Sequence, residues 1–510
     1  MAEPDPIARP LGAWIHRQAE VRPDSAALSF GGATLTFAAF ADRIDRLTFG
    51  LHRRLQLQVG ERIAYLGHNH ADLLTLMFAA ARLGLIVAPL NWRLAPPEHQ
   101  TILADAAPKA LLVQEPFADE AENLLREGAA WRPIALDFSH GGWFSFDDLL
   151  DGSGEVAAVG GGEHPLQLVY TSGTTGLAKG AVLTQDALCW NAANSVDMHG
   201  LTHEDRVLTT LPLFHVGGLN IQTLPALAVG AEVLLQARFD PASFLEIIAC
   251  RRVTLTVLVP AIMKALIDHP AFATADLSSL RQIATGSSIV PTSLIQPFLD
   301  HGIPVTQVYG TTETAPIAVY QRKEDAAHTL GSTGKTARHG EMRLVDDDGR
   351  PLAAGASGHI QIRGPQVMTG YWNNPEATAG AFDGAWFRTG DIGRLDEGGS
   401  LWVEGRADDL IKSGSERIYP AEIEDLLRMD SDVEDVVVVG RADPAWGEVP
   451  VAVVQLAEGA VRDPDRLLQR LDGRIARFKW PKEVCFVDAL PRSALGKILR
   501  YVLRAEIEKS

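Results

Sequence analysis

The sequence has little cysteine and no excess of positive charge. Its three cysteines, Cys189, Cys250 and Cys485, lie far apart and match neither a metal site nor a disulfide framework, so we expect free thiols in a reducing cytoplasm. The net charge is −18, with 64 acidic against 46 basic residues. Such a balance disfavours general binding to nucleic acids or to anionic membranes, although a local basic site for phosphates remains compatible with it.

The sequence also lacks an uninterrupted hydrophobic run of membrane-spanning length. The longest apolar stretch, residues 73–90, is broken by Arg82, Gly84 and Pro89, so a buried helix that leads into a strand explains it better. The first six residues contain no basic region and no apolar core, so we expect no secretory leader. At 510 residues, the chain exceeds the size of a single hydrophobic core, and two or more domains are expected.

Strand-like and helix-like apolar segments alternate in the first 330 residues, which predicts parallel sheets with crossover helices. The segments that show it are residues 63–66, 72–83, 86–90, 207–211, 244–250 and 255–259. Thr184 is a predicted N-cap of the helix that follows it. After about residue 331, turn signals become frequent and indicate a β-rich subdomain. A compact α/β unit is expected from about residue 409, with a helix at 420–429 and strands at 436–439 and 449–455.

Residues 170–180 concentrate hydroxyls, glycines and one lysine directly after an apolar, strand-like run. Glycines allow a tight turn that directs backbone N–H groups toward an anion, hydroxyls donate to phosphate oxygens, and Lys179 adds a positive charge. The segment therefore predicts a triphosphate-binding loop, although its spacing is not that of the P-loop. A surface loop is the alternative for this segment by itself. The candidate phosphate-binding residues are Thr171, Ser172, Gly173, Thr174, Thr175, Gly176 and Lys179.

Five segments resemble, in order, the signatures of the adenylate-forming superfamily, which includes acyl-CoA synthetases, luciferases and peptide-synthetase adenylation domains. The segments are residues 170–184, 308–314, 386–391, 405–412 and 491–500. The resemblance implies an α/β fold with a large N-terminal AMP-binding domain (1–404) of parallel sheets with helices and a β-rich subdomain. It further implies a hinge (405–409) and a small, mobile α+β domain (410–510) that carries a catalytic lysine.

The chemistry implied is attack of a carboxylate on the α-phosphorus of ATP, which gives an acyl-adenylate and pyrophosphate. Two anions must meet, so cations and oriented dipoles are needed where the charge accumulates. Lys497 resembles the family lysine that contacts the carboxylate and the α-phosphate; a solvated lysine near the terminus is the alternative. Glu313, helped by the Thr171 hydroxyl, matches the position that holds Mg²⁺.

Further roles implied by the resemblance concern the nucleotide. Tyr309 is expected to stack on adenine, unless it is a core tyrosine. Asp391 is expected to accept the ribose hydroxyls and Arg406 to reach ribose or phosphate, while Asp408 matches the hinge position. The remaining nucleotide-binding candidates are Gly286, Ser287, Gly310, Thr311 and Thr312.

The resemblance also implies a second half-reaction, in which the thiol of coenzyme A displaces AMP. The residues that match the coenzyme A segment are Lys412, Ser413 and Gly414. Three positions depart from the common pattern: Ser415 where glycine is frequent, Arg417 in place of Asn or Gln, and Gln185 where histidine is frequent. Ser415 adds a side chain beside the path expected for the thiol. A carrier protein stays open as an alternative acceptor.

Residues 211–219 resemble the loop that lines the acyl pocket, with His215 either near the carboxylate or simply a structural histidine. The predicted pocket-lining residues are Phe214, Val216, Gly217 and Ile289. They are apolar, and the loop has no aspartate to pair the ammonium of an amino acid. An aryl or short-to-medium aliphatic acid therefore fits best.

We predict an ATP-dependent carboxylic acid–CoA ligase whose partners are a small carboxylic acid, ATP and coenzyme A. Within the superfamily, an acyl-AMP ligase that loads a carrier protein and a luciferase-like oxygenase remain open. A catalytically silent nucleotide-binding protein would be expected to lack Lys497 or Glu313, and a serine hydrolase would need a Gly-x-Ser-x-Gly elbow that is absent. A homodimer is compatible with the sequence, which does not determine the oligomeric state.

Overall fold

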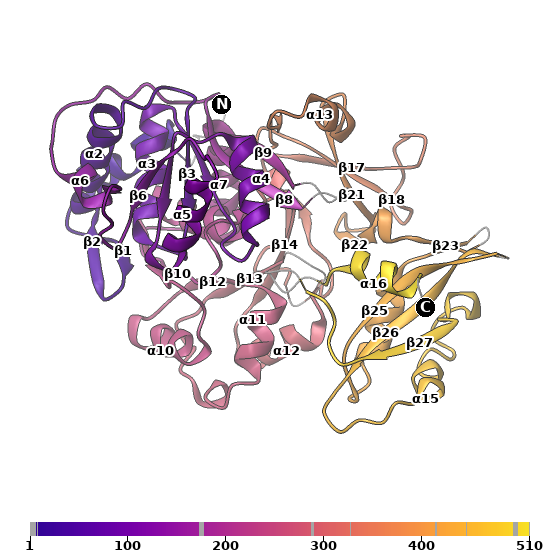
Figure 1. The fold of residues 1–510 in the computed structure, drawn as a ribbon. Coiled ribbons are helices and arrows are strands. Elements are labelled where there is room, and N and C mark those ends of the chain that lie inside the picture. The colour runs from indigo at the N-terminus through magenta and orange to yellow at the C-terminus, as the bar shows by residue number, and fades with distance from the viewer. Residues whose placement is uncertain are drawn as a thin grey trace. The chain divides into compact units, whose positions relative to one another are not determined.

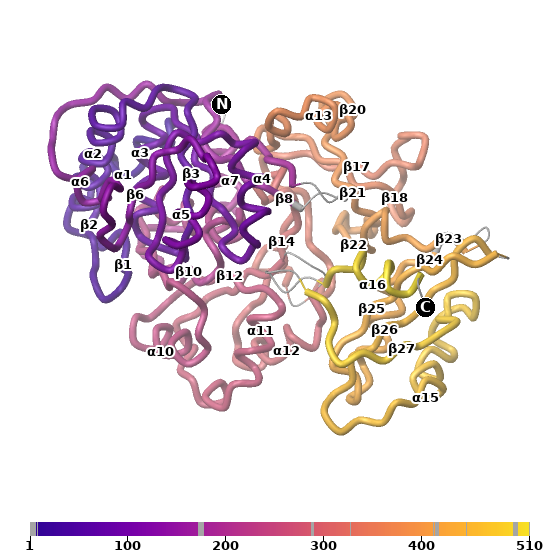
Figure 2. Tube along the Cα trace, in the orientation of Figure 1, coloured from indigo at the N-terminus to yellow at the C-terminus, as the bar shows by residue number. Residues whose placement is uncertain are grey.

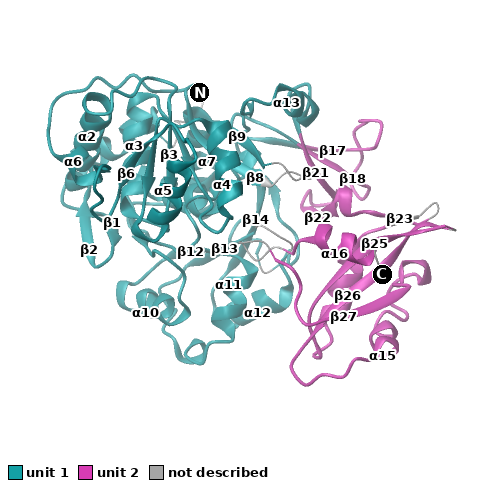
Figure 3. Ribbon diagram, viewed as in Figure 1, with its two compact units in different colours: residues 1–342, 362–387 teal, residues 343–361, 388–510 magenta. Residues whose placement is uncertain are grey.

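A computed structural model describes residues 7, 9–172, 178–286, 290–326, 328–413, 416–444, 446–492 and 498–508. The chain divides into two compact units, residues 1–342 with 362–387 and residues 343–361 with 388–510 (Figure 3). Both mix helices with sheets, so the predicted α/β class is confirmed. The proposed domains 1–404 and 410–510, joined by a hinge at 405–409, stay a prediction.

The first unit contains a nine-stranded sheet with the order β16-β15-β14-β13-β12-β10-β11-β1-β2. Its strands are β1 (Ala26–Phe30), β2 (Ala33–Thr36), β10 (Arg206–Thr209), β11 (Glu232–Leu235), β12 (Leu255–Leu258), β13 (Gln282–Thr285), β14 (Val305–Tyr309), β15 (Val319–Tyr320) and β16 (Lys335–Thr336). From β14 to β1 all neighbours are parallel, and antiparallel strands lie only at the two edges. The parallel pairing agrees with the predicted crossover helices.

A second sheet of eight strands in the same unit has the order β19-β9-β8-β4-β3-β5-β6-β7. Its strands are β3 (Arg62–Leu66), β4 (Ile86–Pro89), β5 (Ala110–Val113), β6 (Arg132–Ala135), β7 (Phe144–Ser145), β8 (Pro165–Ser172), β9 (Ala178–Thr184) and β19 (Gly370–Tyr371). The strands from β8 to β7 are parallel, whereas β8, β9 and β19 pair antiparallel. The predicted phosphate loop therefore connects two strands of one hairpin.

Helices surround and separate these two sheets (Figure 1). The α-helices of the first unit are α1 (Trp14–Val21), α2 (Phe37–Arg53), α3 (Ala71–Leu83), α4 (Pro96–Ala106), α5 (Ala118–Arg126), α6 (Phe146–Leu150), α7 (Gln185–His199), α8 (Val216–Gly218), α9 (Leu224–Val229), α10 (Pro241–Arg251), α11 (Pro260–Ile267), α12 (Thr292–Asp300) and α13 (Pro375–Ala381). The short 3₁₀ or π segments are η1 (Leu11–Ala13), η2 (Glu115–Phe117), η3 (Leu219–Thr223), η4 (Phe272–Thr274) and η5 (Thr312–Thr314). The predicted N-cap of α7 is confirmed, since the Thr184 side chain accepts a hydrogen bond from the Ala187 amide.

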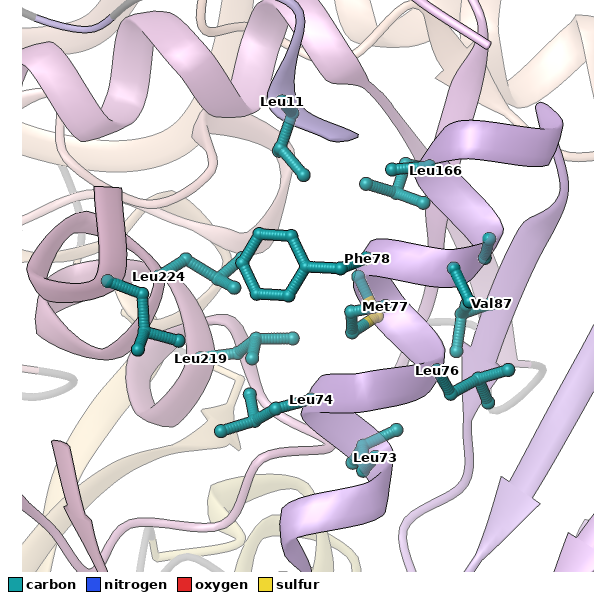
Figure 4. Close-up of a cluster of buried hydrophobic side chains, with 14 of the residues drawn as sticks. Leu11, Leu73, Leu74, Leu76, Met77, Phe78, Val87, Leu166, Leu219 and Leu224 are labelled. Atoms are coloured by element: carbon teal, nitrogen blue, oxygen red, sulfur yellow. The ribbon is translucent and has the colours of Figure 1, made fainter. Parts of the chain in front are cut away.

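Helix α3 lies in the apolar centre of the first unit, in contact with strands of both sheets. All of its residues except Ala71 and Arg82 are buried, as expected for a helix that is hydrophobic all round. Figure 4 shows Phe78 pointing toward Leu219 and Leu224, while Leu76 lies on the side of Val87. The interrupted apolar run of the sequence is thus a core helix followed by strand β4. Among the described residues, none of the helices combines the length and the apolar character that a membrane span requires.

The β-rich sheet predicted after residue 331 is present, with the order β17-β18-β21-β20 and β22 paired to β21. Its strands are β17 (Glu341–Val345), β18 (Ser357–Arg363), β20 (Phe382–Asp383), β21 (Trp386–Leu395) and β22 (Leu401–Arg406). The division of the chain into units passes through β17, β18 and β21.

The remainder of the second unit is a five-stranded sheet with short helices, which the chain trace in Figure 2 follows to the C-terminus. Its elements are η6 (Ala407–Asp409), β23 (Ile411–Ser413), β24 (Glu416–Ile418), α14 (Pro420–Arg428), β25 (Val433–Asp443), β26 (Gly447–Leu456), α15 (Pro464–Gln469), η7 (Arg477–Lys479), β27 (Glu483–Val487) and α16 (Arg500–Ile507). Buried Val436 and Val438 of β25 pack with Ile423 and Leu427 of α14. The helix predicted at 420–429 corresponds to α14, which ends at Arg428, and the strands predicted at 436–439 and 449–455 lie within β25 and β26.

Candidate functional site

The β8–β9 hairpin holds both ends of the predicted phosphate loop. Thr171 and Lys179 are cross-strand partners, and the Thr171 hydroxyl donates to the Lys179 carbonyl at 3.5 Å. The predicted residues 173–177 lie outside the described residues, as does the side chain of Ser172. The hairpin therefore fixes the backbone positions of Thr171 and Lys179 at the two ends of the segment.

Side-chain contacts tie this hairpin to neighbouring segments. The Tyr170 hydroxyl donates to Asp105 at 2.6 Å, and the Trp372 indole N–H donates to the Asp105 carbonyl at 3.2 Å. Burial and the nearby Asp105 carboxylate raise the pKa of Tyr170 well above its ordinary value, so this tyrosine remains a neutral donor. Residues 370–372 are thereby held beside β9, where β19 pairs with it.

Tyr371 links the phosphate hairpin to the predicted metal ligand. Its hydroxyl donates to Glu313 Oε1 at 2.8 Å, and Lys179 Nζ lies 5.5 Å from the centre of its ring. The backbone reinforces the link, because the Met368 amide donates to the Glu313 carbonyl at 2.8 Å. Glu313 is 9% exposed, so its carboxylate is held by Tyr371 rather than left in solvent. Predicted residues Lys179 and Glu313 are thus brought into one cluster.

The second signature forms a tight turn after β14. Tyr309 is 9% exposed at the end of that strand, and the turn η5 carries Glu313. A Cβ on Gly310 would lie 1.7 Å from the Pro316 carbonyl oxygen, so only glycine fits there. Gly286 is similarly constrained, since its Cβ would lie 2.4 Å from the Val308 carbonyl oxygen. Both glycines thus allow the close backbone contacts at the ends of β13 and β14.

The threonine hydroxyls in this turn differ in their hydrogen bonding. Thr314 accepts from the Thr311 amide at 2.9 Å and donates to the Thr311 carbonyl at 3.1 Å, which closes the turn. The Thr311 hydroxyl is buried without a hydrogen-bond partner among the described residues, and Thr312 is 7% exposed beside it. A buried hydroxyl without a partner is a candidate donor to a ligand oxygen.

The predicted ribose-binding pair lies in the second unit, on adjacent strands β21 and β22. Asp391 and Arg406 are cross-strand partners, and their carboxylate and guanidinium lie 3.0 Å apart. Gly390 has φ of 76°, and a Cβ there would lie 2.8 Å from the Arg406 guanidinium. The Asp391 amide donates to the Thr389 hydroxyl at 3.1 Å. These contacts fix the carboxylate at the strand edge.

The predicted hinge and the predicted coenzyme A segment follow β22 in the chain. Asp408 is exposed in the turn η6, and its carbonyl accepts from Arg504 at 3.3 Å. Lys412 and Ser413 lie on β23, with the side chain of Lys412 outside the described residues. The predicted residues Gly414, Lys497, Ser287 and Ile289 also lie outside the described residues. Their roles therefore stay predictions.

The predicted acyl loop runs from the end of β10 into α8 and η3. Phe214 and Val216 are 7% and 3% exposed, and Val216 belongs to the main core cluster. His215, which precedes α8, is partly exposed, with its ring centre 6.3 Å from that of Phe214. Gly217 lines a small cavity of about 10 Å³, which is room for about one water molecule. Of the four predicted lining residues, Gly217 thus faces open space and Val216 packs inward.

Sequence reasoning missed Tyr371, because β19 has only two residues and shows no periodicity. It also missed Gln222, which lines the same cavity as Gly217 and stands between Asn220 and Thr223 in a mixed polar and apolar segment that gave no clear signal. Among the described residues, no group of three or more His, Cys, Asp or Glu side chains can hold a metal ion. The Glu313 carboxylate is an oxygen ligand of the kind that Mg²⁺ takes together with phosphate oxygens and water.

Two family models match most of the chain. Residues 15–372 match the family described as AMP-binding enzyme, and residues 422–497 match the family described as AMP-binding enzyme C-terminal domain. An indoleacetate–CoA ligase of Aromatoleum aromaticum is 48% identical over 96% of both chains. A feruloyl-CoA synthase of Amycolatopsis sp is 39% identical over 97% of this chain and 98% of that protein.

Solved structures show the same fold. The crystal structure of an anthranilate CoA ligase in complex with anthranoyl-AMP superimposes with a TM-score of 0.90 and 27% identity, over 98% of both chains. This similarity spans both compact units of the chain.

Proposed function

The chain belongs to the family of AMP-binding enzymes and is an acid–thiol ligase; from that premise we propose that it converts an aryl carboxylic acid to its CoA thioester. The observation that carries the choice of an aryl acid is the 48% identity to a ligase named for indoleacetate, together with 39% to a synthase named for the feruloyl group. The apolar side chains of Phe214 and Val216, both buried in the predicted acyl loop, support the same choice. Aliphatic acids remain the comparison set for the test.

In the first half-reaction, a carboxylate oxygen of the acid attacks the α-phosphorus of ATP, and the bond to pyrophosphate breaks. Lys179 offsets phosphate charge from the end of β9, and Tyr371 holds the Glu313 carboxylate that faces the same cluster. Glu313 and the Thr171 hydroxyl are the proposed protein contacts of Mg²⁺, which when bound would neutralise charge on the departing pyrophosphate. The buried Thr311 hydroxyl is a proposed donor to a phosphate oxygen.

In the second half-reaction, the thiol of coenzyme A attacks the acyl carbon, and AMP leaves with the electrons of the acyl–phosphate bond. Asp391 is proposed to hold the ribose hydroxyls, since its carboxylate is oriented by Arg406. Asp408 is proposed as the hinge and Lys412 to Gly414 as the segment beside the thiol. These assignments rest on the match of residues to the family signatures.

Lys497 is the proposed cation between carboxylate and α-phosphate. The test is an ATP- and CoA-dependent assay of AMP, pyrophosphate and thioester with aryl and aliphatic acids, on wild type and Lys497→Ala. A matched control is Lys482→Ala, which removes an exposed lysine of the same unit. Wild type and Lys482→Ala are expected to form aryl-CoA, whereas Lys497→Ala loses adenylate formation.

Other results would change the assignment. If no acid yields AMP and pyrophosphate, the proposed reaction is wrong. If adenylate forms and coenzyme A is never consumed, an acyl-AMP ligase that loads a carrier protein is the better description. The three free cysteines support a reducing compartment such as the cytoplasm as the site of action.

A further inference from the structure

The cavity beside Gly217 contains two buried polar side chains that the reaction described above does not use. We propose that Thr210 and Gln222 form a hydrogen-bonding anchor for a donor group, a ring N–H or a ring hydroxyl, on the aryl part of the acid. The inference rests on the proposed function, because it specifies which aryl acids that acyl site accepts. Both residues line the cavity together with Gly217 and Val257.

Burial and lack of pairing distinguish these two residues. Thr210 is 3% exposed and Gln222 is 2% exposed. The Thr210 hydroxyl and both polar atoms of the Gln222 amide have no hydrogen-bond partner within the described residues. Buried polar groups are nearly always paired, so three unpaired atoms around one cavity indicate that a ligand or water completes them.

The neighbouring polar groups are already paired within the protein. The hydroxyls of Thr209 and Thr223 lie 2.7 Å apart, and Thr223 donates to the Gly218 carbonyl at 2.6 Å. The Asn220 amide exchanges two hydrogen bonds of 2.9 Å with Gln167. The unpaired state is therefore restricted to the two side chains Thr210 and Gln222, and is not general to the segment.

The adjacent residues Gly217 and Gly218 differ in whether close packing requires a glycine. A Cβ on Gly218 would lie 2.3 Å from the Pro212 carbonyl oxygen, so close packing demands glycine there. A Cβ on Gly217 would meet no atom within 4 Å, so glycine at this position is not required by close packing. Gln222 lies on the π-helical segment η3, a backbone form frequent at functional sites.

The anchor defines the chemistry of the guest. The Gln222 carbonyl oxygen and the Thr210 hydroxyl both accept, so an N–H or O–H on the ring is satisfied by either. Apolar Val257 and Leu211 line the same cavity, and its space of about 10 Å³ suits one water-sized donor group. An analogue of the same shape without the donor would leave the anchor unpaired, which is how sites built for a hydrogen bond discriminate.

The first experiment needs only the wild-type protein. We compare kcat/KM for AMP release with two matched pairs of acids: indole-3-acetic with 1-methylindole-3-acetic acid, and 4-hydroxycinnamic with cinnamic acid. The donor-bearing member of at least one pair is expected to be preferred about tenfold or more. Equal values in both pairs would mean that water alone occupies the cavity and would overturn the inference, while AMP release itself would still support the ligase. No AMP release with any acid would instead refute the proposed function.

The second experiment removes the anchor. Gln222→Met and Thr210→Val keep the size of each side chain, and the preference is expected to fall below about threefold while the analogue without the donor is still activated. Thr256→Val is the matched control, because this buried threonine donates to the Leu208 carbonyl at 2.9 Å, and it should keep the preference. Retention of the full preference in both anchor variants would overturn the inference. If the variants do not fold, the wild-type comparison decides.

Discussion

Replacement of Tyr371 by phenylalanine removes a single hydroxyl that joins the phosphate hairpin to Glu313. The ring remains, so the contact with Lys179 at 5.5 Å and the pairing of β19 with β9 are kept. What is lost is the 2.8 Å hydrogen bond to the Glu313 carboxylate. Glu313 is then free to leave the orientation in which it is proposed to contact the metal.

The expected size of the effect follows from the charge of the acceptor. A hydrogen bond to a charged group contributes about 1.5 to 3 kcal/mol, so kcat/KM for adenylate formation should fall by about 10- to 150-fold. Because the defect lies at the proposed metal ligand, the Mg²⁺ concentration for half-maximal rate should rise as well. A variant that had only lost stability would not show this second change.

Pyrophosphate release, measured over a series of Mg²⁺ concentrations, tests the prediction. The matched control is Tyr320→Phe, which removes a buried hydroxyl that donates to Asp197 in the same unit. The control should lower the unfolding temperature and leave the Mg²⁺ dependence unchanged. The reasoning is refuted if Tyr371→Phe alters neither the rate nor the Mg²⁺ dependence by more than about twofold, well below the expected 10-fold minimum.

Three further predictions concern packing at two glycines, the proposed ribose acceptor and the pH dependence of stability. Gly310→Ala should lower the free energy of unfolding by about 1–3 kcal/mol through overpacking and reduce AMP formation, whereas Gly217→Ala should change that free energy by less than about 0.5 kcal/mol. Urea denaturation measures both variants, and equal losses would contradict the packing argument. Asp391→Asn should raise KM for ATP about tenfold with a smaller change in kcat, because a charged acceptor for ribose is lost; an unchanged KM in steady-state kinetics would contradict it. Burial lowers the pKa of His199 from 6.5 to about 4, so the unfolded state takes up a proton near pH 6.5 that the folded state does not. The free energy of unfolding should therefore fall between pH 6.5 and 4 by up to about 1.4 kcal/mol per pH unit. Urea denaturation at several pH values should show a shallower decline in His199→Asn; identical slopes would contradict the assignment.

Local sequence patterns predicted the elements that carry a strong signal. Helix α3 was expected at residues 72–83 and spans Ala71–Leu83, and the cap at Thr184 was expected from its hydroxyl. Strand β9 was not predicted, because its first residues are small or charged and resemble a loop. It forms a strand because β8 provides a complete row of backbone partners, which is a tertiary effect.

The site was predictable as separate segments but not as a cluster. The signatures identified Glu313 and Lys179, yet nothing local to either indicates that Tyr371 lies between them. That contact depends on β19 pairing with β9 across a large separation in sequence. The anchor at Thr210 and Gln222 was missed for a related reason, since an unpaired state is visible only when all neighbours are known.

Helix α3 has a consequence for how the first unit unfolds. The side chains of α3 pack against strands of both sheets. If one sheet unfolds, α3 loses part of its packing, and the other sheet then loses the helix that covers it. A fragment that lacked the strands of one sheet would expose the apolar side chains of α3 to water. Such a fragment should aggregate rather than stay folded. The two sheets should consequently melt together, in one cooperative step.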